Sequence, residues 1–182
     1  QNMNIVILNI DISRPRNAKH RMYWNNLDIN DLGPLKDALK DFKPEIIIHL
    51  AARTDLSGDN LDAYKTNILG VRNIIDCSNG LPSVKRVVFA SSMLVCKLGY
   101  LPKGDRDYKP STPYGESKVL GECLVRKEMN DLKEWVIVRP TSLWGPWFDV
   151  PYKNFFDAVR GGYFFYPKGY VVQRSYGFIL NS

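Results

Sequence analysis

Four short, almost continuously apolar runs recur along the chain, and segments with helical spacing of apolar residues separate the later ones. The runs are Asn4–Ile10, Glu45–Leu50, Arg86–Ala90 and Trp135–Val138. A strand with one solvated face alternates apolar and polar residues, whereas a continuous apolar run is typical of a parallel strand covered on both faces. Helices are expected at Leu35–Asp41, Asn60–Ser78 and Pro113–Lys127. This alternation predicts an α/β fold with a doubly wound parallel sheet.

The regular alternation ends near Pro140. Beyond it, glycine, proline and tryptophan residues interrupt any periodic pattern, and aromatic side chains crowd the segment from Tyr152 to Tyr176. We therefore expect two parts: residues 1–147 hold the parallel sheet, and residues 148–182 begin a smaller lobe.

The composition restricts the class of protein. Of the 182 residues, 45% are hydrophobic and 24% are charged, which is ordinary for a globular chain in water. No stretch approaches the ~20 apolar residues that a membrane span needs, and no signal peptide is visible, so we expect a cytoplasmic protein without a membrane partner. Three cysteines without CxxC spacing, together with two histidines, argue against a disulfide framework or a bound metal.

The net charge of +6 leaves two interpretations open. A solvated basic surface is the simpler one, and attraction of anionic small molecules such as nucleotide diphosphates is the functional one. The basic residues are dispersed and form no recognisable nucleic-acid motif, so no nucleic-acid partner is expected.

The sharpest local signal is the segment PYGESK, in which Tyr114 precedes Lys118 by four residues. Residues four apart share one face of a helix. An ammonium group near a phenol favours the phenolate and lowers a pKa that starts near ~10, which would make the tyrosine a usable base. Among ten tyrosines only Tyr114 has a lysine at this spacing. The competing interpretation is a pair of exposed residues on a surface helix.

Two further signals follow expected strands. Ser91 and Ser92 lie directly after the Arg86–Ala90 run, and the small residues Ala51 and Ala52 follow Glu45–Leu50. The carboxyl ends of parallel strands form the edge where α/β folds bind ligands, so a hydroxyl and an open backbone there suit a binding site. A serine-rich turn and ordinary tight packing are the structural alternatives.

Together these pieces resemble the extended short-chain dehydrogenase/reductase family, which comprises NAD-dependent sugar-nucleotide epimerases and dehydratases on a Rossmann-like fold. The matching segments run in the family's order from residue 4 to about 147: ILNIDIS, NLDIND, IIIHLAA, YKTNILGVRNII, VKRVVFASS, PYGESKVLGE and VIVRPTSLWGP. The resemblance implies that Tyr114 is the general base and acid and that Lys118 is its electrostatic partner and a ribose contact. Ser92 would hydrogen-bond the reacting hydroxyl or carbonyl of the substrate.

The resemblance also implies a bound NAD. Asp11 would accept hydrogen bonds from the adenosine ribose and repel a 2′-phosphate, although Arg14 and Arg16 could instead attract one. Further cofactor contacts would be Asp28, Ile29, Leu50, Ala51, Ala52, Thr66, Tyr114, Lys118 and Pro140. Ser92, Ser142 and Arg174 would bind a nucleotide-sugar substrate.

Several positions depart from the family pattern. The first glycine is Gly33 and only ten residues precede Asp11, so the glycine-rich phosphate loop is missing. We therefore expect residues 1–147 to form the NAD-binding domain without its first βα unit, and the chain of 182 residues alone to be inactive. Ser142 stands where the family often has asparagine against the substrate pyrophosphate. Met93 and Leu94 replace the acidic pair of the 4,6-dehydratases, which argues against that reaction.

The function predicted from this resemblance is an NAD-dependent epimerase that acts on a nucleotide sugar by transient hydride transfer. The alternatives are an NAD(P)-dependent ketoreductase of the same family and a non-catalytic NAD-sensing or interaction protein on the same fold. A homodimer is expected through the helices at Asn60–Ser78 and Pro113–Lys127. The competing interpretation is that both apolar helix faces pack only on the chain's own sheet.

Overall fold

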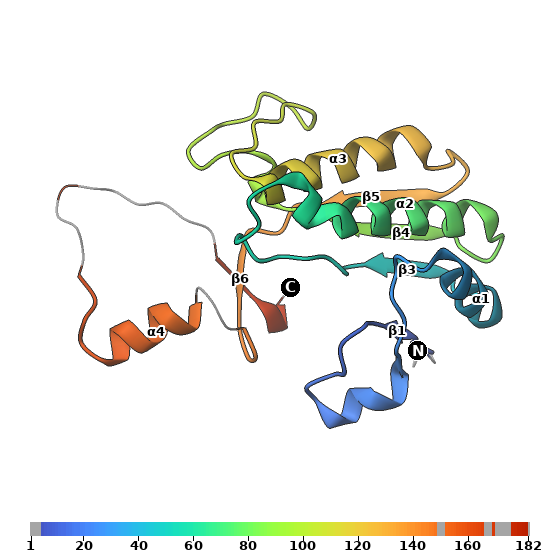
Figure 1. Cartoon of the computed structure of the whole chain (residues 1–182), viewed down its shortest axis with the longest axis horizontal. Coiled ribbons are helices and arrows are strands. Elements are labelled where there is room, and N and C mark those ends of the chain that lie inside the picture. Colours follow the sequence, from blue (N-terminus) through green and yellow to red (C-terminus); the bar gives the residue numbers. More distant parts are fainter. Residues whose placement is uncertain (1–4, 149–151, 166–168, 170–175, 182) are drawn as a thin grey trace. The chain divides into compact units, whose positions relative to one another are not determined.

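The computed structural model describes residues 5–148, 152–165, 169 and 176–181. The chain divides into two compact units, Gln1–Arg139 and Pro140–Ser182 (Figure 1). Within the described residues every strand ladder is parallel, and helices alternate with the strands. The predicted α/β class is therefore confirmed.

The first unit is built on a three-stranded parallel sheet. Its strands are β3 (Ile46–His49), β4 (Arg86–Ala90) and β5 (Glu134–Val138), in the order β3-β4-β5. The expected runs end within a residue or two of these bounds. The register pairs Ile47 with Val87 and Val87 with Trp135. Parallel strands in this register end at one common edge, so the residues that follow them are brought to the same side of the sheet.

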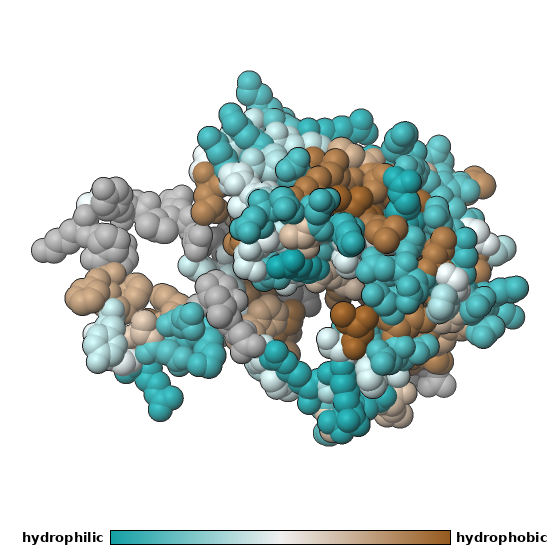
Figure 2. Space-filling view, in the orientation of Figure 1, coloured by the Kyte–Doolittle hydropathy of each residue, from teal (hydrophilic) through white to brown (hydrophobic). Residues whose placement is uncertain are grey.

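Three helices cover one face of this sheet: α1 (Leu32–Phe42), α2 (Lys65–Gly80) and α3 (Pro113–Glu128) (Figure 1). The expected helix from Asn60 begins later because Leu61–Tyr64 forms a 3-10 turn, η2, capped by the Asn60 side chain. Pro113 occupies the first turn of α3, where a missing N–H costs nothing. Apolar side chains also reach the outer surface in the region of α2 and α3 (Figure 2).

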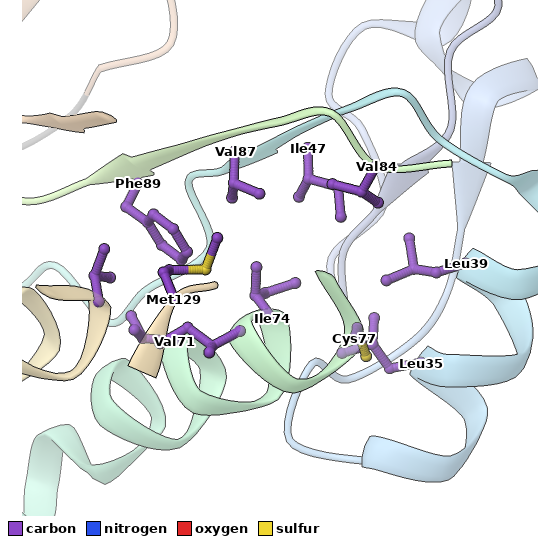
Figure 3. Packing of buried hydrophobic residues seen from close by; sticks show 12 residues of the cluster. Leu35, Leu39, Ile47, Val71, Ile74, Cys77, Val84, Val87, Phe89 and Met129 are labelled. Carbon is purple, nitrogen blue, oxygen red and sulfur yellow. The ribbon is translucent and has the colours of Figure 1, made fainter. Parts of the chain in front are cut away.

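The hydrophobic core lies between these helices and the inner face of the sheet (Figure 3). Each helix contributes apolar side chains at helical spacing, and each strand contributes alternate residues. The buried cluster comprises Leu35, Leu39, Ile47, Val71, Ile74, Ile75, Cys77, Val84, Val87, Phe89, Val125 and Met129.

The opposite face of the sheet differs from the prediction that the strands are covered on both sides. Ile46 and Ile48 are 56% and 61% exposed, and Val136 and Val138 are 43% and 37% exposed. The reason is topological. Right-handed crossovers that run in one direction across a sheet place their helices on one face, so α1, α2 and α3 cannot cover the other.

A second parallel pair precedes this sheet. It consists of β1 (Asn9–Ile10) and β2 (Trp24–Asn25), joined through the 3-10 helix η1 (Ala18–Tyr23). The strand expected over Asn4–Ile10 is therefore shorter: Asn4 lies outside the described residues, and residues 5–8 have no regular structure. A strand is defined by its hydrogen-bonded partner, and β2 offers pairing only to the last two residues of the run.

The second unit has a small parallel pair, β6 (Ser142–Trp144) and β7 (Tyr176–Phe178), together with α4 (Tyr152–Arg160) and the 3-10 helix η4 (Ile179–Asn181). Its packing is aromatic, because the Trp144 ring lies 5.5 Å from that of Phe156 and 4.8 Å from that of Phe178 between centroids. Among the described helices of the chain, none is long and apolar enough to cross a membrane.

Leu35→Ala tests the role of α1 in the core. Leu35 is fully buried, so the shortened side chain should lower the free energy of unfolding by about 2–5 kcal/mol. Leu132→Ala is the matched control, because Leu132 is 91% exposed and its loss should change stability by less than about 0.5 kcal/mol. Urea unfolding followed by circular dichroism measures both, and equal effects would contradict the assignment of α1 to the core.

Candidate active site

Tyr114 and Lys118 lie in the first turns of α3, at the carboxyl edge of the sheet. Thr112 caps the helix, its hydroxyl accepting a hydrogen bond from the Gly115 N–H at 3.0 Å. Both Tyr114 and Lys118 are only 8% exposed, so they do not form a surface pair. The Lys118 ammonium lies 5.8 Å from the centroid of the Tyr114 ring and donates to the Ala90 carbonyl, at the end of β4, at 3.0 Å.

Ser92 lies beside this pair. It precedes the 3-10 helix η3 (Met93–Val95), and its hydroxyl accepts a hydrogen bond from the Leu94 N–H at 3.1 Å. Its side chain also acts on Tyr114, whose pKa it lowers against the effect of burial. Gly115 packs directly on the Leu94 carbonyl and leaves no room for a Cβ, which brings α3 against η3. The structure therefore gathers the predicted tyrosine, lysine and serine at one edge of the sheet.

The electrostatics of Tyr114 differ from the expectation that Lys118 lowers its pKa. Burial raises the pKa of Tyr114 above its usual value, the hydrogen bond with Ser92 opposes that rise, and Tyr64 adds to it. The Tyr64 ring meets the Tyr114 ring edge-on at 5.9 Å. Lys118 sits over the ring with its ammonium directed to the Ala90 carbonyl, so its charge is not aimed at the phenol oxygen. Burial in turn lowers the pKa of Lys118 to about 8.

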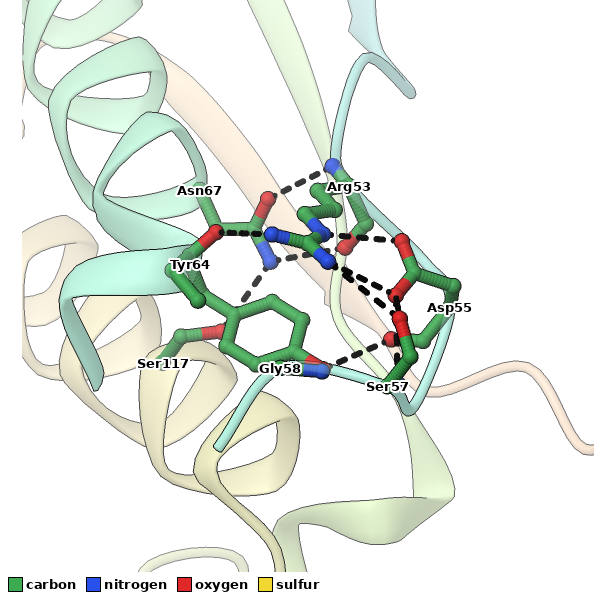
Figure 4. Close-up of polar contacts among 8 residues, drawn as sticks. Arg53, Asp55, Ser57, Gly58, Tyr64, Asn67 and Ser117 are labelled. Carbon is green, nitrogen blue, oxygen red and sulfur yellow. Dashed lines mark hydrogen bonds and ion pairs between the residues drawn. The ribbon is translucent and has the colours of Figure 1, made fainter. Parts of the chain in front are cut away.

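The segment that follows β3 is fixed by the buried side chain of Asn67 (Figure 4). The Asn67 amide accepts from the Arg53 N–H at 2.7 Å, donates to the Arg53 carbonyl at 3.0 Å and donates to the Ser117 hydroxyl at 3.0 Å. Asn67 was not among the predicted site residues. Its spacing with Val71 and Ile74 places it on the buried face of α2, and a polar residue on such a face is the signal that could have found it.

Arg53 and Tyr64 close the same loop. The Arg53 guanidinium pairs with Asp55 at 2.8 Å and lies 5.2 Å from the Tyr64 ring centroid. The Tyr64 hydroxyl donates to the Asp55 carbonyl at 2.9 Å and accepts from the Gly58 N–H at 3.0 Å. Tyr64 therefore both holds this loop in place and contacts Tyr114.

The other predicted cofactor residues of the first unit fall into two groups. Leu50, Ala51 and Ala52 follow β3 and are exposed or half-buried. Near the start of α1, Asp28 and Ile29 adjoin Asn30, whose side-chain amide donates to the Thr66 hydroxyl at 3.3 Å. Two backbone carbonyls also accept from the buried Asn73 side chain, that of Ile29 at 2.7 Å and that of Asn30 at 3.2 Å.

The remaining predictions lie elsewhere. Asp11 follows β1 with an exposed carboxylate that accepts a hydrogen bond from the Ser13 N–H at 2.7 Å. Pro140 and Ser142 belong to the second unit, where Ser142 pairs with Tyr176. Arg174 lies outside the described residues. Within the described part of the chain, no group of three or more His, Cys, Asp or Glu residues could hold a metal ion.

Comparison with known proteins gives a consistent set of relatives. The sequence profile of the NAD dependent epimerase/dehydratase family matches residues 2–160. A putative dihydroflavonol 4-reductase of Synechocystis is 30% identical over 145 residues, which cover 74% of this chain and 40% of that protein. A UDP-glucose 4-epimerase of Mycolicibacterium smegmatis is 29% identical over 120 residues, which cover 62% of this chain and 38% of that protein. The chain therefore spans less than half the length of these relatives.

Solved structures show the same fold. The enzyme WbmG of Bordetella bronchiseptica, in complex with NAD, has a TM-score of 0.65 and 26% identity, with 82% of this chain and 47% of that chain covered. A dTDP-4-dehydrorhamnose reductase of Bacillus anthracis, in complex with NADP, also has a TM-score of 0.65, with 27% identity and coverage of 76% and 50%. The UDP-glucose 4-epimerase of Thermotoga maritima has a TM-score of 0.74 at 19% identity, with coverage of 93% and 60%, and shows the fold alone.

Lys118→Met is expected to raise the free energy of unfolding at pH 7. The pKa of Lys118 falls from 10.5 to about 8 on burial, so the folded protein binds this proton less tightly than the unfolded chain does. Below about pH 8 folding bears the full cost of the buried charge, on the order of 1–3 kcal/mol. Between about pH 8 and about pH 10.5 that cost disappears, so the stability of the unmodified protein should rise toward that of the variant.

Urea unfolding at pH 7 and near pH 10.5 checks this expectation. Lys127→Met is the matched control, because Lys127 is exposed in the last turn of the same helix and should show no such pH dependence. A Lys118→Met variant that is less stable than the unmodified protein at pH 7 would contradict the assignment.

Proposed function

The chain belongs to the NAD dependent epimerase/dehydratase family. We propose that it contains the catalytic residues of an NAD-dependent epimerase that acts on a nucleotide sugar. The observation that carries the proposal is the gathering of Tyr114, Lys118 and Ser92 at the carboxyl edge of a parallel sheet. Ligands bind at that edge in open α/β folds.

The residues at this edge fit a bound NAD. Ala51 and Ala52 leave the backbone after β3 open to a cofactor, and Asp11 offers an exposed carboxylate for ribose hydroxyls. A bound NAD would supply reversible hydride transfer at the sugar carbon. In an epimerase the hydride returns to the opposite face of the same carbon, so no cofactor is consumed.

The protein residues then handle the proton. The Tyr114 oxygen takes the proton of the sugar hydroxyl as the carbonyl forms, and returns it when the carbonyl is reduced. The Ser92 hydroxyl hydrogen-bonds the same sugar oxygen and holds it near Tyr114. The pKa of Lys118, about 8, leaves most of this side chain charged at neutral pH, so its ammonium can donate hydrogen bonds to the cofactor ribose.

The residues after Ser92 favour an epimerase or a reductase over a 4,6-dehydratase. Met93 and Leu94 begin η3 and provide no carboxylate for proton abstraction or water loss. A ketoreductase remains the second candidate, since both a reductase and an epimerase are among the relatives. Net consumption of NADH would separate the two, because an epimerase regenerates its cofactor.

Three finer proposals accompany this function. The NAD-binding domain spans residues 1–147, and a substrate lobe begins after it. Ser142, near the end of the domain, and Arg174, in the lobe, would both contact the substrate. The compact units themselves divide earlier, after Arg139. We also propose a homodimer through the outer faces of α2 and α3, where Leu69 and Leu120 are exposed.

Tyr114→Phe is expected to lower turnover of a nucleotide sugar by about 10²–10⁴-fold in the complete enzyme, because the acid and base is lost. Tyr100→Phe is the matched control: it removes another hydrogen-bonded hydroxyl, which donates to Asp107 at 2.8 Å in a separate loop. NMR of the product measures both the rate and the reaction type. Unchanged turnover in Tyr114→Phe would exclude the role, and a 4-keto-6-deoxy product would exclude an epimerase.

Calorimetric titration of the complete enzyme with NAD and NADP is expected to show tighter binding of NAD. Asp11→Asn keeps an oxygen that can accept from the Ser13 N–H but removes the charge, so it should weaken NAD binding about tenfold, the equivalent of ~1.4 kcal/mol. Tighter binding of NADP by the unmodified enzyme would show that Arg14 and Arg16, rather than Asp11, govern the choice of cofactor.

A further inference from the structure

A buried carboxylate lies one turn beyond Lys118, and the proposed reaction does not use it. Glu122 is 2% exposed. One of its oxygens accepts from the Ser91 hydroxyl at 2.6 Å and from Arg139 Nε at 2.8 Å. The other accepts from the Tyr108 hydroxyl at 2.9 Å and from Arg139 Nη2 at 2.7 Å.

The charge on Glu122 persists in spite of its burial. Burial alone would raise its pKa, but hydrogen bonds from Arg139, Ser91 and Tyr108 hold the pKa below its usual value. A buried ion is tolerated only when its lone pairs are satisfied in good geometry. Moving any one of these elements would leave a donor or the carboxylate without a partner, so the cluster fixes their relative positions.

The donors come from three separate parts of the chain that meet at the catalytic edge. Ser91 follows β4, and its N–H donates to the Val138 carbonyl at 2.8 Å. Arg139 follows β5, and Tyr108 belongs to the loop before α3. Glu122 therefore ties α3, which carries Tyr114 and Lys118, to the ends of both strands.

This anchoring gives the two neighbouring serines, Ser91 and Ser92, different environments. Ser92 has extended backbone, with φ −155° and ψ 152°. Successive side chains of an extended segment point to opposite sides. With the Ser91 hydroxyl bound to Glu122, the Ser92 side chain is turned the other way, toward Tyr114, whose pKa it lowers.

We propose that Glu122 is a positioning residue. By binding Ser91 it fixes the end of β4 against α3, so that the neighbouring Ser92 faces Tyr114. The proposal rests on the proposed function for the catalytic roles of Ser92 and Tyr114. The geometric part of the proposal, that Ser91 holds Ser92 in place, rests on contacts within this chain. It can be measured without an activity assay.

Two matched variants test the anchor. Ser91→Ala and Tyr108→Phe each remove one hydroxyl that donates to Glu122, but only Ser91 adjoins Ser92. Tyrosines labelled with ¹³C at Cζ report the pKa of Tyr114, whose signal is assigned with Tyr114→Phe. The groups facing Tyr114 are Tyr64, Lys118 and Ser92, and of these the Ser92 hydrogen bond lowers its pKa.

We expect the pKa of Tyr114 to rise in Ser91→Ala, in the same direction as in Ser92→Ala, and to stay unchanged in Tyr108→Phe. Ser91→Thr restores a hydroxyl and should return the pKa to its original value. Circular dichroism confirms that each variant is folded, and Ser91→Thr keeps the comparison available if Ser91→Ala does not fold. An unchanged pKa in Ser91→Ala, or equal shifts in Ser91→Ala and Tyr108→Phe, would overturn the proposal.

Kinetics of the complete enzyme give the second readout. Ser91→Ala should lower kcat by about 10- to 100-fold with KM nearly unchanged, because a misplaced catalytic group slows the chemical step. Tyr108→Phe should leave both constants close to their original values. Equal losses in the two variants would indicate a merely structural role for the cluster. The proposed function is tested by a different variant: it would be contradicted only if Tyr114→Phe retained its turnover.

Discussion

The site geometry depends on the close packing of α2 against α3, which the buried Asn67 amide makes specific. A Cβ on Gly121 would lie 3.4 Å from Val71 Cγ2, so a small residue keeps the helices close. Across this contact Asn67 donates to the Ser117 hydroxyl, and Ser117 donates to the Tyr114 carbonyl at 2.7 Å. Because the same amide binds the Arg53 backbone, the loop after β3 and the backbone of Tyr114 form one hydrogen-bonded unit.

Two buried charged groups at this edge differ in how fully hydrogen bonds compensate their charge. Glu122 is surrounded by donors and its pKa stays low, whereas Lys118 has one carbonyl acceptor and its pKa falls to about 8. The lysine charge also acts on His49, whose pKa drops to about 4, mainly through burial and secondarily through Lys118. A weakly compensated cation lowers stability, and such groups concentrate where a protein needs chemistry rather than packing.

The sequence predicted the elements whose signals are local. The apolar runs at Glu45–Leu50, Arg86–Ala90 and Trp135–Val138 became strands, and the spacing of Tyr114 and Lys118 placed both on one buried helix face. Features that depend on distant partners were not predictable in this way. The pairing of β1, the hydrogen bonds of Asn67 and the raised pKa of Tyr114 each depend on residues that are remote in sequence. Local sequence pattern therefore predicts the helices and strands, whereas tertiary contacts determine the surroundings of their side chains.

The two sheets of the first unit are joined through the hydrophobic core. The helix α1 leads from β2 to β3 and covers the same face as α2 and α3, so a right-handed connection places β2 on the side of β3 away from β4. No ladder joins β1 to β3 in the described chain, yet Ile10 and Leu27 pack against the common core. The two sheets are therefore held together by shared core packing rather than by a common ladder. Asp11 follows β1 and Ala51 lies beyond the end of β3, so the proposed function requires a cofactor that contacts both residues and reaches Tyr114.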